Sequence, residues 1–208
     1  MNSIRYKVIS IIYFYLPLIL FALSCKSKQL PILGQPIELD GKLSYPQTPD
    51  FTFKNQYGDL ISRNTLKGKI HIANFFFTSC ATICPKTIRS MIKIANHFKG
   101  NTDIIFINFS IDYKKDSVER LKTYYDRLQI DLAAFYLVHV PEMAEVKRIT
   151  ENYMSIAVED PTAQGGFDHS GWILLSDKNG YLRSFCLGTD ENDVDRFIKD
   201  IETLLDER

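Results

Sequence analysis

Two cysteines four positions apart, Cys80 and Cys84, are the side chains of this sequence best suited to chemistry. They lie between the apolar run of residues 72–77 and Pro85, which suits the first turn of a helix. A dithiol at a strand-to-helix turn can exchange electrons as a reversible disulfide, or it can hold a soft metal ion through its thiolates. A histidine far downstream, His169 in the sequence Asp-His-Ser, bears on the choice.

The spacing of the two cysteines leaves both kinds of chemistry open. Ordinary dithiol oxidoreductases carry Cys-x-x-Cys, in which a helix N-terminus lowers the pKa of the first thiol, whereas this chain has Cys-x-x-x-Cys. Residues four apart on a helix share one face at about 6 Å, which permits a disulfide and equally lets two thiolates converge on one ion. A closed four-cysteine zinc site needs more cysteines than lie nearby. Two thiolates with one imidazole suit copper, because thiolates favour Cu(I) and the imidazole helps to accommodate Cu(II).

The elements that must position these residues alternate along the chain. Turn residues, apolar runs and helical spacing predict a β-hairpin around Gly58 and then the order β-α-β-α-β-α-β-β-α. The strands after the hairpin are expected at residues 70–77, 104–109, 134–138, 172–175 and 181–185. The helices are expected to begin at Pro85, at an N-cap pair of Asp116 and Glu119, and at Pro141, and the last carries apolar residues from Val194 to Leu205. This order predicts an α/β protein with a thioredoxin-like fold, in which helices flank a central mixed β-sheet and an N-terminal β-hairpin comes first.

This fold plan places His169 beside the dithiol. The dithiol follows a central strand at its carboxyl end, where open α/β sheets build their sites. In a thioredoxin-like sheet, the loop that enters the strand at Trp172 borders the dithiol turn. Ordinary thioredoxin relatives keep a proline in that loop to dock peptides, but residues 164–171 hold no proline and His169 stands there instead. The histidine favours a metal site.

The N-terminus predicts an export signal. Residues 1–24 combine Arg5 and Lys7 with an apolar stretch, residues 8–23, which is short for a membrane span of ~20 residues. The stretch ends in Leu-Ser-Cys, which resembles the box cleaved by the bacterial lipoprotein signal peptidase, so that Cys25 would bear lipid. The alternative is an uncleaved anchor. Both predict a membrane-anchored protein on the exported side of the bacterial cell envelope, with residues 25–49 as a tether and residues 50–208 as the domain.

Composition narrows the class of protein further. The 208 residues include 25 basic and 25 acidic side chains, and loss of the signal removes two of the positive charges. The mature chain is therefore slightly acidic, whereas a nucleic-acid partner demands a basic surface. Its length suits one domain with a sizeable core. With Cys25 lipidated, an odd number of cysteines remains, so no structural disulfide framework is expected, and Cys186 is expected to be a small core residue.

Three stretches, in order along the chain, carry a family resemblance. They are Phe-Phe-Phe-Thr-Ser-Cys-Ala-Thr-Ile-Cys-Pro at residues 75–85, Phe-Ser-Ile-Asp at 109–112 with the helix that follows, and Asp-His-Ser at 168–170 with the hairpin after it. Together they resemble the SCO/SenC family of copper-binding, thioredoxin-like assembly factors, from about Leu30 to the C-terminus. Cys-x-x-x-Cys-Pro alone is a moderately specific signal of this family. All three stretches in this order are a much more specific one.

The resemblance implies a function and a set of ligands. A family member would bind one copper ion, as Cu(I) or Cu(II), through Cys80, Cys84 and His169. It would deliver copper to, or help to mature, the dinuclear copper site of cytochrome c oxidase subunit II or of another exported cuproprotein. Asp112 would lie near the site as a carboxylate behind the ligands, although a role as helix cap or turn former fits it equally well.

Two other classes of activity remain as alternatives. In a thiol-disulfide oxidoreductase that acts on cysteines of exported proteins, Cys80 would attack with Cys84 as its partner, and His169 would be dispensable. A peroxidase of the peroxiredoxin type shares the fold plan, but those enzymes usually carry threonine three residues before the reactive cysteine. Phe77 and Ala81 occupy the two corresponding positions here, so this class ranks last.

Overall fold

The computed structural model describes residues 29–39, 41–163 and 166–207. The predicted export signal and the lipidated Cys25 lie outside the described residues. No helix within the described ranges is long and apolar enough to cross a membrane.

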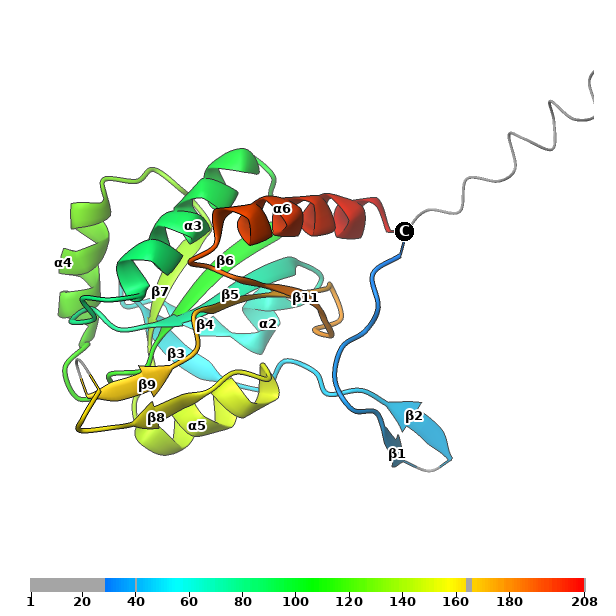
Figure 1. Cartoon of the computed structure of the whole chain (residues 1–208), viewed down its shortest axis with the longest axis horizontal. Helices are drawn as coiled ribbons and strands as arrows, with labels where there is room; N and C mark the ends of the chain where they lie inside the picture. The colour runs from blue at the N-terminus through cyan, green and yellow to red at the C-terminus, as the bar shows by residue number, and fades with distance from the viewer. Residues whose placement is uncertain (1–28, 40, 164–165, 208) are drawn as a thin grey trace, which may run out of the picture.

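A seven-stranded mixed sheet forms the centre of the molecule (Figure 1). Its strands, in spatial order, are β11 (Leu182–Leu187), β10 (Trp172–Ser176), β5 (Ile70–Phe76), β6 (Ile104–Ser110), β7 (Phe135–His139), β3 (Thr52–Asn55) and β4 (Leu60–Ser62). The three central strands β5, β6 and β7 run parallel, and the outer pairs are antiparallel. The predicted N-terminal hairpin is confirmed as β3–β4, and the thioredoxin-like fold is confirmed with it.

Helices cover both faces of this sheet. On one face lie α3 (Cys84–His97), α4 (Val118–Leu128) and α6 (Glu191–Asp206), with α3 and α6 in contact. On the other face lies α5 (Met143–Asn152), as Figure 1 shows. A one-turn helix, α2 (Arg63–Leu66), follows β4 and was not expected.

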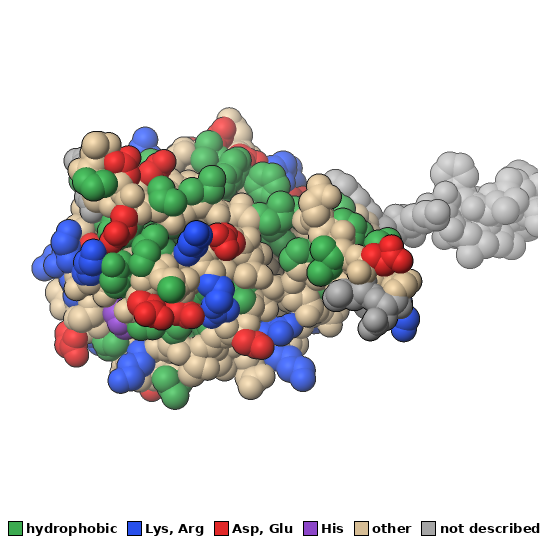
Figure 2. Space-filling view, turned by 90° about the horizontal axis from the view of Figure 1, so that it is seen from below, with side chains coloured by type: hydrophobic (Ala, Val, Ile, Leu, Met, Phe, Trp, Pro, Cys, Tyr) green, Lys and Arg blue, Asp and Glu red, His purple; other side chains and the backbone are tan. Residues whose placement is uncertain are grey.

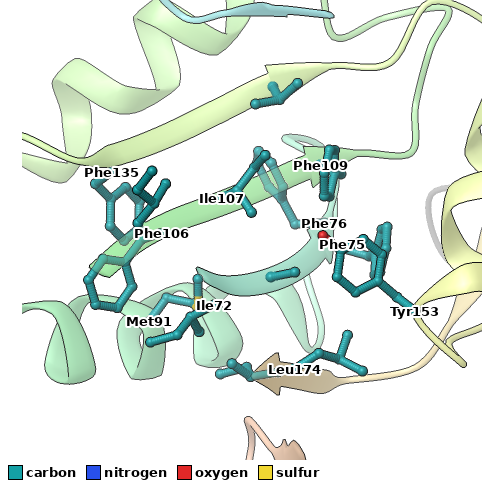
Figure 3. Packing of buried hydrophobic residues seen from close by; sticks show 14 of the residues in the cluster. Ile72, Phe75, Phe76, Met91, Phe106, Ile107, Phe109, Phe135, Tyr153 and Leu174 are labelled. Carbon is teal, nitrogen blue, oxygen red and sulfur yellow. The ribbon is translucent and has the colours of Figure 1, made fainter. Parts of the chain in front are cut away.

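The two-sided cover explains why β5 is almost entirely apolar, with His71 and Asn74 as its two polar residues. All seven of its residues are buried, and successive side chains point to opposite faces. Phe75 packs against Phe109 and Tyr153 on the α5 face (Figure 3), whereas Phe76 packs against Tyr124 of α4 on the other face. The strand that ends just before the dithiol is thus held rigidly from both sides.

Two further short hairpins were not predicted. One is β1 (Ile37–Leu39) with β2 (Lys42–Ser44), and the other is β8 (Ala157–Glu159) with β9 (Phe167–His169). Strands of three residues leave little alternation in a sequence, so residues 164–170 are predicted only as a loop. In the structure, residues 167–169 form a strand paired with β8, and this strand ends at His169.

The N-cap of α4 differs from the expected pair. The helix begins at Val118 and its N-cap is Ser117, whose hydroxyl accepts a hydrogen bond from the amide of Arg120. The predicted cap, Asp116, points its fully buried carboxylate into the protein instead. Serine and aspartate are about equally favourable as N-cap residues. Ser117 is the cap here because the hydrogen bonds of Asp116 hold its carboxylate inside the protein.

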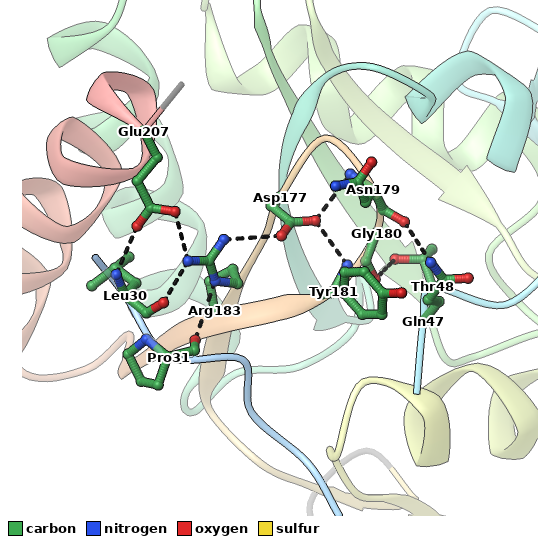
Figure 4. Close-up of polar contacts among 10 residues, drawn as sticks. All are labelled: Leu30, Pro31, Gln47, Thr48, Asp177, Asn179, Gly180, Tyr181, Arg183 and Glu207. Atoms are coloured by element: carbon green, nitrogen blue, oxygen red, sulfur yellow. Dashed lines mark hydrogen bonds and ion pairs between the residues drawn. The ribbon is translucent and has the colours of Figure 1, made fainter. Parts of the chain in front are cut away.

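The described part of the expected tether contacts the domain near Leu30 and again near Thr48 (Figure 4), whereas the β1–β2 hairpin between them projects from the domain (Figure 1). The amide of Leu30 donates to Glu207 at 2.6 Å, and its carbonyl accepts from the guanidinium of Arg183. Further along, the amide of Thr48 donates to the carbonyl of Gly180 at 2.8 Å. The segment is therefore attached to the β10–β11 hairpin and to the C-terminal end of the chain.

The surface of the face below the sheet mixes charges of both signs. Seen from that side, lysine, arginine and acidic side chains alternate with apolar ones (Figure 2). This distribution agrees with the equal numbers of basic and acidic residues in the chain.

Candidate metal centre

The two cysteines occupy the turn between β5 and α3. Cys84 is the first residue of α3, with Pro85 directly behind it in the first turn, where its missing N–H costs nothing. Cys80 precedes the helix, and its amide donates to the carbonyl of Phe77 at 3.2 Å, which closes a tight turn. The amide of Cys84 donates to the Cys80 sulfur at 3.4 Å. The sulfur of Cys80 therefore lies at the N-terminal end of α3, where free amides favour negative charge.

The β8–β9 hairpin brings His169 to the dithiol. The Nε2 atom of His169 lies 3.5 Å from the sulfur of Cys84, and one ligand atom from each of His169, Cys80 and Cys84 lies within 4.8 Å of the others. The other ring nitrogen, Nδ1, lies 3.2 Å from the carbonyl oxygen of Ser170. A proton on Nδ1 satisfies that carbonyl and leaves the Nε2 lone pair directed at the two sulfurs.

Aromatic packing holds the histidine ring in this position. The edge of the His169 ring meets Phe77 at a centroid distance of 5.5 Å, and Phe77 in turn contacts Phe167 of β9 at 5.5 Å. Phe77 is 1% exposed and immediately follows β5. The same side chain thus borders both the cysteine turn and the histidine hairpin.

The two thiols differ in acidity because they share a hydrogen bond. Donation from the Cys84 thiol lowers the pKa of Cys80 far below the usual thiol value, and contacts with Thr82 and His169 lower it further. The same bond, together with burial, raises the pKa of Cys84 strongly. The shared hydrogen bond therefore favours the thiolate at Cys80 and the thiol at Cys84.

The donor set fits a soft metal ion. Two sulfurs and one imidazole nitrogen converge on one point, and this combination accepts Cu(I) and also accommodates Cu(II). The residue Cys80 is 8% exposed, Cys84 is 1% exposed, and His169 is half-buried. The site is therefore reached from solvent past Cys80 and the histidine.

Asp112 lies in the loop after β6 and forms a turn. Its Oδ1 accepts from the amide of Lys115 at 3.1 Å, and its buried Oδ2 has no hydrogen-bond partner among the described residues. No hydrogen bond of the described residues joins Asp112 to Cys80, Cys84 or His169. Its proposed place behind the ligands stays a prediction, while its part in a turn is seen directly.

Asp116, which the sequence predicted only as a helix cap, contacts the cysteine turn through its carboxylate. Its oxygens accept from the amide and hydroxyl of Thr78 at 2.9 and 2.5 Å and from the hydroxyl of Ser110 at 2.6 Å. Arg120 adds an ion pair at 3.4 Å. In the sequence, Asp116 stands where a helix cap is ordinary, so only its inward orientation distinguishes it.

Cys186 has no part in this site. It lies in β11 with 0% exposure, as expected for a small core residue. Burial raises the pKa of its thiol. All three described cysteines are free thiols.

Comparison with known proteins identifies the family of this chain. The family model described as SCO1/SenC matches residues 41–206. The chain is 27% identical over 171 residues to the SCO1 protein homolog of Bacillus subtilis, covering 82% of this chain and 87% of the relative.

Solved structures of the same family share the fold. A SCO1/SenC family lipoprotein from Bacillus anthracis superposes with a TM-score of 0.71 at 25% identity, over 84% of this chain and 99% of the other. BsSco, described as a member of the Sco family of cytochrome c oxidase assembly proteins with a disulfide switch, gives 0.70 at 23% identity, over 87% and 100%.

A copper-bound structure shows the same fold at a greater distance. ScoI of Arabidopsis thaliana, solved with copper bound, gives a TM-score of 0.61 at 21% identity, over 74% of this chain and 98% of the other. The family model covers most of the chain, and the dithiol, the histidine and the thioredoxin-like sheet all lie inside the matched range. The chain therefore belongs to the SCO1/SenC family.

Proposed function

We propose that this protein binds one copper ion through Cys80, Cys84 and His169 and delivers it to an exported cuproprotein. The observation that supports this most directly is the convergence of the three ligand atoms within 4.8 Å of one another. The cysteines come from one turn and the histidine from a hairpin 85 residues further along the chain. Such convergence of soft donors from distant segments is typical of a metal site.

The burial of the ligands suits a protein that passes its metal ion on to a partner protein. Both cysteines are buried, but Cys80 is more exposed, at 8%, than Cys84, at 1%. A partner thiolate can therefore reach the ion from the side of Cys80 and replace the ligands one at a time. His169, on a separate short hairpin, can leave first while the sulfurs still hold the metal.

The proposed client is the dinuclear copper site of cytochrome c oxidase subunit II. This assignment rests on membership of the SCO1/SenC family and on the description of BsSco as belonging to a family of oxidase assembly proteins. The predicted export signal and lipidated Cys25 would hold the domain on the exported side of the bacterial envelope. Residues 25–49 would then link the lipid to the domain.

Anaerobic copper titration of the exported chain, residues 26–208, tests this function. We expect the reduced protein to bind one Cu(I), with loss of binding in Cys80→Ser and Cys84→Ser and no loss in Cys186→Ser, whose side chain lies outside the site. Unchanged copper stoichiometry in the first two variants would contradict the proposal.

Thiol-disulfide exchange is the second candidate. The lowered pKa of Cys80 favours it, because the thiolate is the attacking form. His169→Ala separates the two functions: it should weaken copper binding and delivery but largely spare exchange of Cys80 and Cys84 with glutathione. Equal loss of both activities would favour neither over the other and would indicate a damaged fold, which circular dichroism detects.

A further inference from the structure

The loop between β6 and α4, residues 111–117, contacts both ligand-bearing segments. It begins where the amide of Ile111 donates to the carbonyl of Phe76, the last residue of β5, at 2.9 Å. Towards its end Asp116 reaches the cysteine turn, and between them Tyr113 and Lys114 reach the histidine hairpin. One short segment therefore spans the two parts of the site.

The contact with the cysteine turn is buried. The carboxylate of Asp116 is 0% exposed and accepts from the amide and hydroxyl of Thr78, two residues before Cys80. Ser110 donates to the same carboxylate at 2.6 Å, and the Nε of Arg120 donates to the Thr78 hydroxyl at 2.6 Å. Hydrogen bonds to a buried charge are short and strong, and an unmatched partner there is costly. This end of the loop fixes the backbone that carries Cys80.

The contact with the histidine hairpin is exposed. Lys114 Nζ donates to Glu159 Oε1 at 2.9 Å, and the hydroxyl of Tyr113 donates to the same oxygen at 3.3 Å. The side chains of Lys114 and Glu159 are 61% and 43% exposed. Exposed ion pairs are weak and are screened by salt. This end of the loop can therefore open without disturbing the cysteine turn.

The hairpin ladder connects Glu159 to His169. Glu159 pairs with Phe167 at one end of the β8–β9 ribbon, and Ala157 pairs with His169 at the other. Phe167 and His169 also share the contact with Phe77. A shift of β8 away from Lys114 would therefore move the histidine ring relative to the two sulfurs.

We propose that the β6–α4 loop sets the distance between the dithiol and His169, with Asp116 as the positioning residue of the cysteine turn and Glu159 as the positioning residue of the histidine. This inference rests on the proposed copper function for its biological meaning. The buried end holds the two sulfurs in place, and the exposed end holds the histidine reversibly. His169, which has to leave the metal first during transfer, is thus the ligand held by the weaker, exposed contact.

A double-mutant cycle on the full exported chain tests the histidine end. Glu159→Gln removes the negative charge and keeps the size of the side chain. We expect it to weaken the affinity for Cu(I), by no more than His169→Ala does. In the His169→Ala background the same change should have no further effect, since Glu159 acts only through the histidine. Glu151→Gln is the matched control, because among the described residues this exposed glutamate of α5 forms an ion pair only with Lys147, at 4.0 Å.

The cysteine end predicts the opposite pattern. Asp116→Asn places an amide NH₂ where a carboxylate oxygen accepted hydrogen bonds and removes the counter-charge of Arg120. We expect a loss of Cu(I) affinity of roughly 10- to 100-fold, in both the wild-type and the His169→Ala backgrounds. If this variant fails to fold, Thr78→Val against Thr78→Ser gives the same comparison, because only serine keeps the hydroxyl.

Salt and amide exchange supply readouts that a general loss of stability would not give. At about 1 M salt the effect of Glu159→Gln should vanish while that of Asp116→Asn persists, since only the former removes an exposed ion pair. In the metal-free protein, Glu159→Gln should speed hydrogen exchange of the amides of β8 and β9 and leave those of β5 unchanged.

Two outcomes would overturn the inference. They are an equal effect of Glu159→Gln in both histidine backgrounds, and unchanged exchange of the hairpin amides in the metal-free variant. A wild-type protein that binds no copper would refute the proposed function, whereas the exchange experiment would still decide whether Glu159 holds the hairpin.

Discussion

One shared hydrogen bond makes the two cysteines chemically unequal. Cys84 is 1% exposed at the start of α3 and donates to the sulfur of Cys80, which is the more exposed of the two at 8%. The attacking or departing sulfur is therefore Cys80 in either of the two candidate functions. The residue types alone could not rank the two thiols, because the ranking depends on burial and on the direction of one hydrogen bond.

Alkylation of the metal-free protein tests this inequality. The pKa of Cys80 is lowered, so its thiolate persists at acidic pH, and removal of the Cys84 donor should raise that pKa and reduce the thiolate fraction. We expect iodoacetamide to modify Cys80 at about pH 6 and the rate to fall by more than about tenfold in Cys84→Ala. The buried Cys186 serves as an internal unreactive control. An undiminished rate in Cys84→Ala would contradict the assignment.

At the scale of elements, the first turn of α3 is positioned by close packing against the end of β11. The hydroxyl of Ser90 donates to the carbonyl of Gly188 at 2.8 Å, and the amide of Gly188 donates to Gly171 at 2.8 Å. A Cβ on Gly188 would lie 2.9 Å from Ile173 Cδ1 and 3.1 Å from the methyl group of Thr87, one turn after Cys84. Only glycine allows α3 to approach the sheet this closely.

A pair of alanine substitutions tests this packing. Gly188→Ala should destabilise the fold by about 1–3 kcal/mol, because the added methyl group must displace Ile173 or α3. Gly171→Ala is the control, since its nearest atom, in Leu187, would lie at an ordinary contact distance of 3.6 Å. Urea unfolding of both variants gives the comparison, and equal stabilities would show that the close approach is unimportant.

At the scale of the whole molecule, Arg183 joins the two ends of the described chain. It donates to Asp177 at 3.0 Å and to Glu207 at 2.6 Å, and it also contacts the carbonyls of Leu30 and Pro31 (Figure 4). The side chains of Arg183, Asp177 and Glu207 are only 11–13% exposed. The cluster lies on the β10–β11 hairpin, so it fixes where the segment that begins at Leu30 joins the domain.

Arg183→Met tests the cluster. Methionine keeps the apolar stem but leaves two nearly buried carboxylates without their cation, so we expect a loss of about 3–5 kcal/mol of unfolding free energy. Arg89→Met is the matched control, because Arg89 is exposed on α3. Guanidinium unfolding measures both, and similar stabilities would mean that the ends are held by other contacts.

The amino-acid sequence by itself determined the order of the main strands and helices, the thioredoxin-like fold and the three candidate ligands. Those features follow from local signals: buried strands such as β5 are almost entirely apolar, apolar residues recur every three or four positions in the helices, and thiol and imidazole side chains suit a soft metal ion. Only the tertiary structure decided that His169 arrives on a paired ribbon and that Asp116 points inward at Thr78. Both depend on contacts between segments far apart in the chain, and three-residue strands or a lone aspartate leave no periodic trace from which such contacts could be predicted.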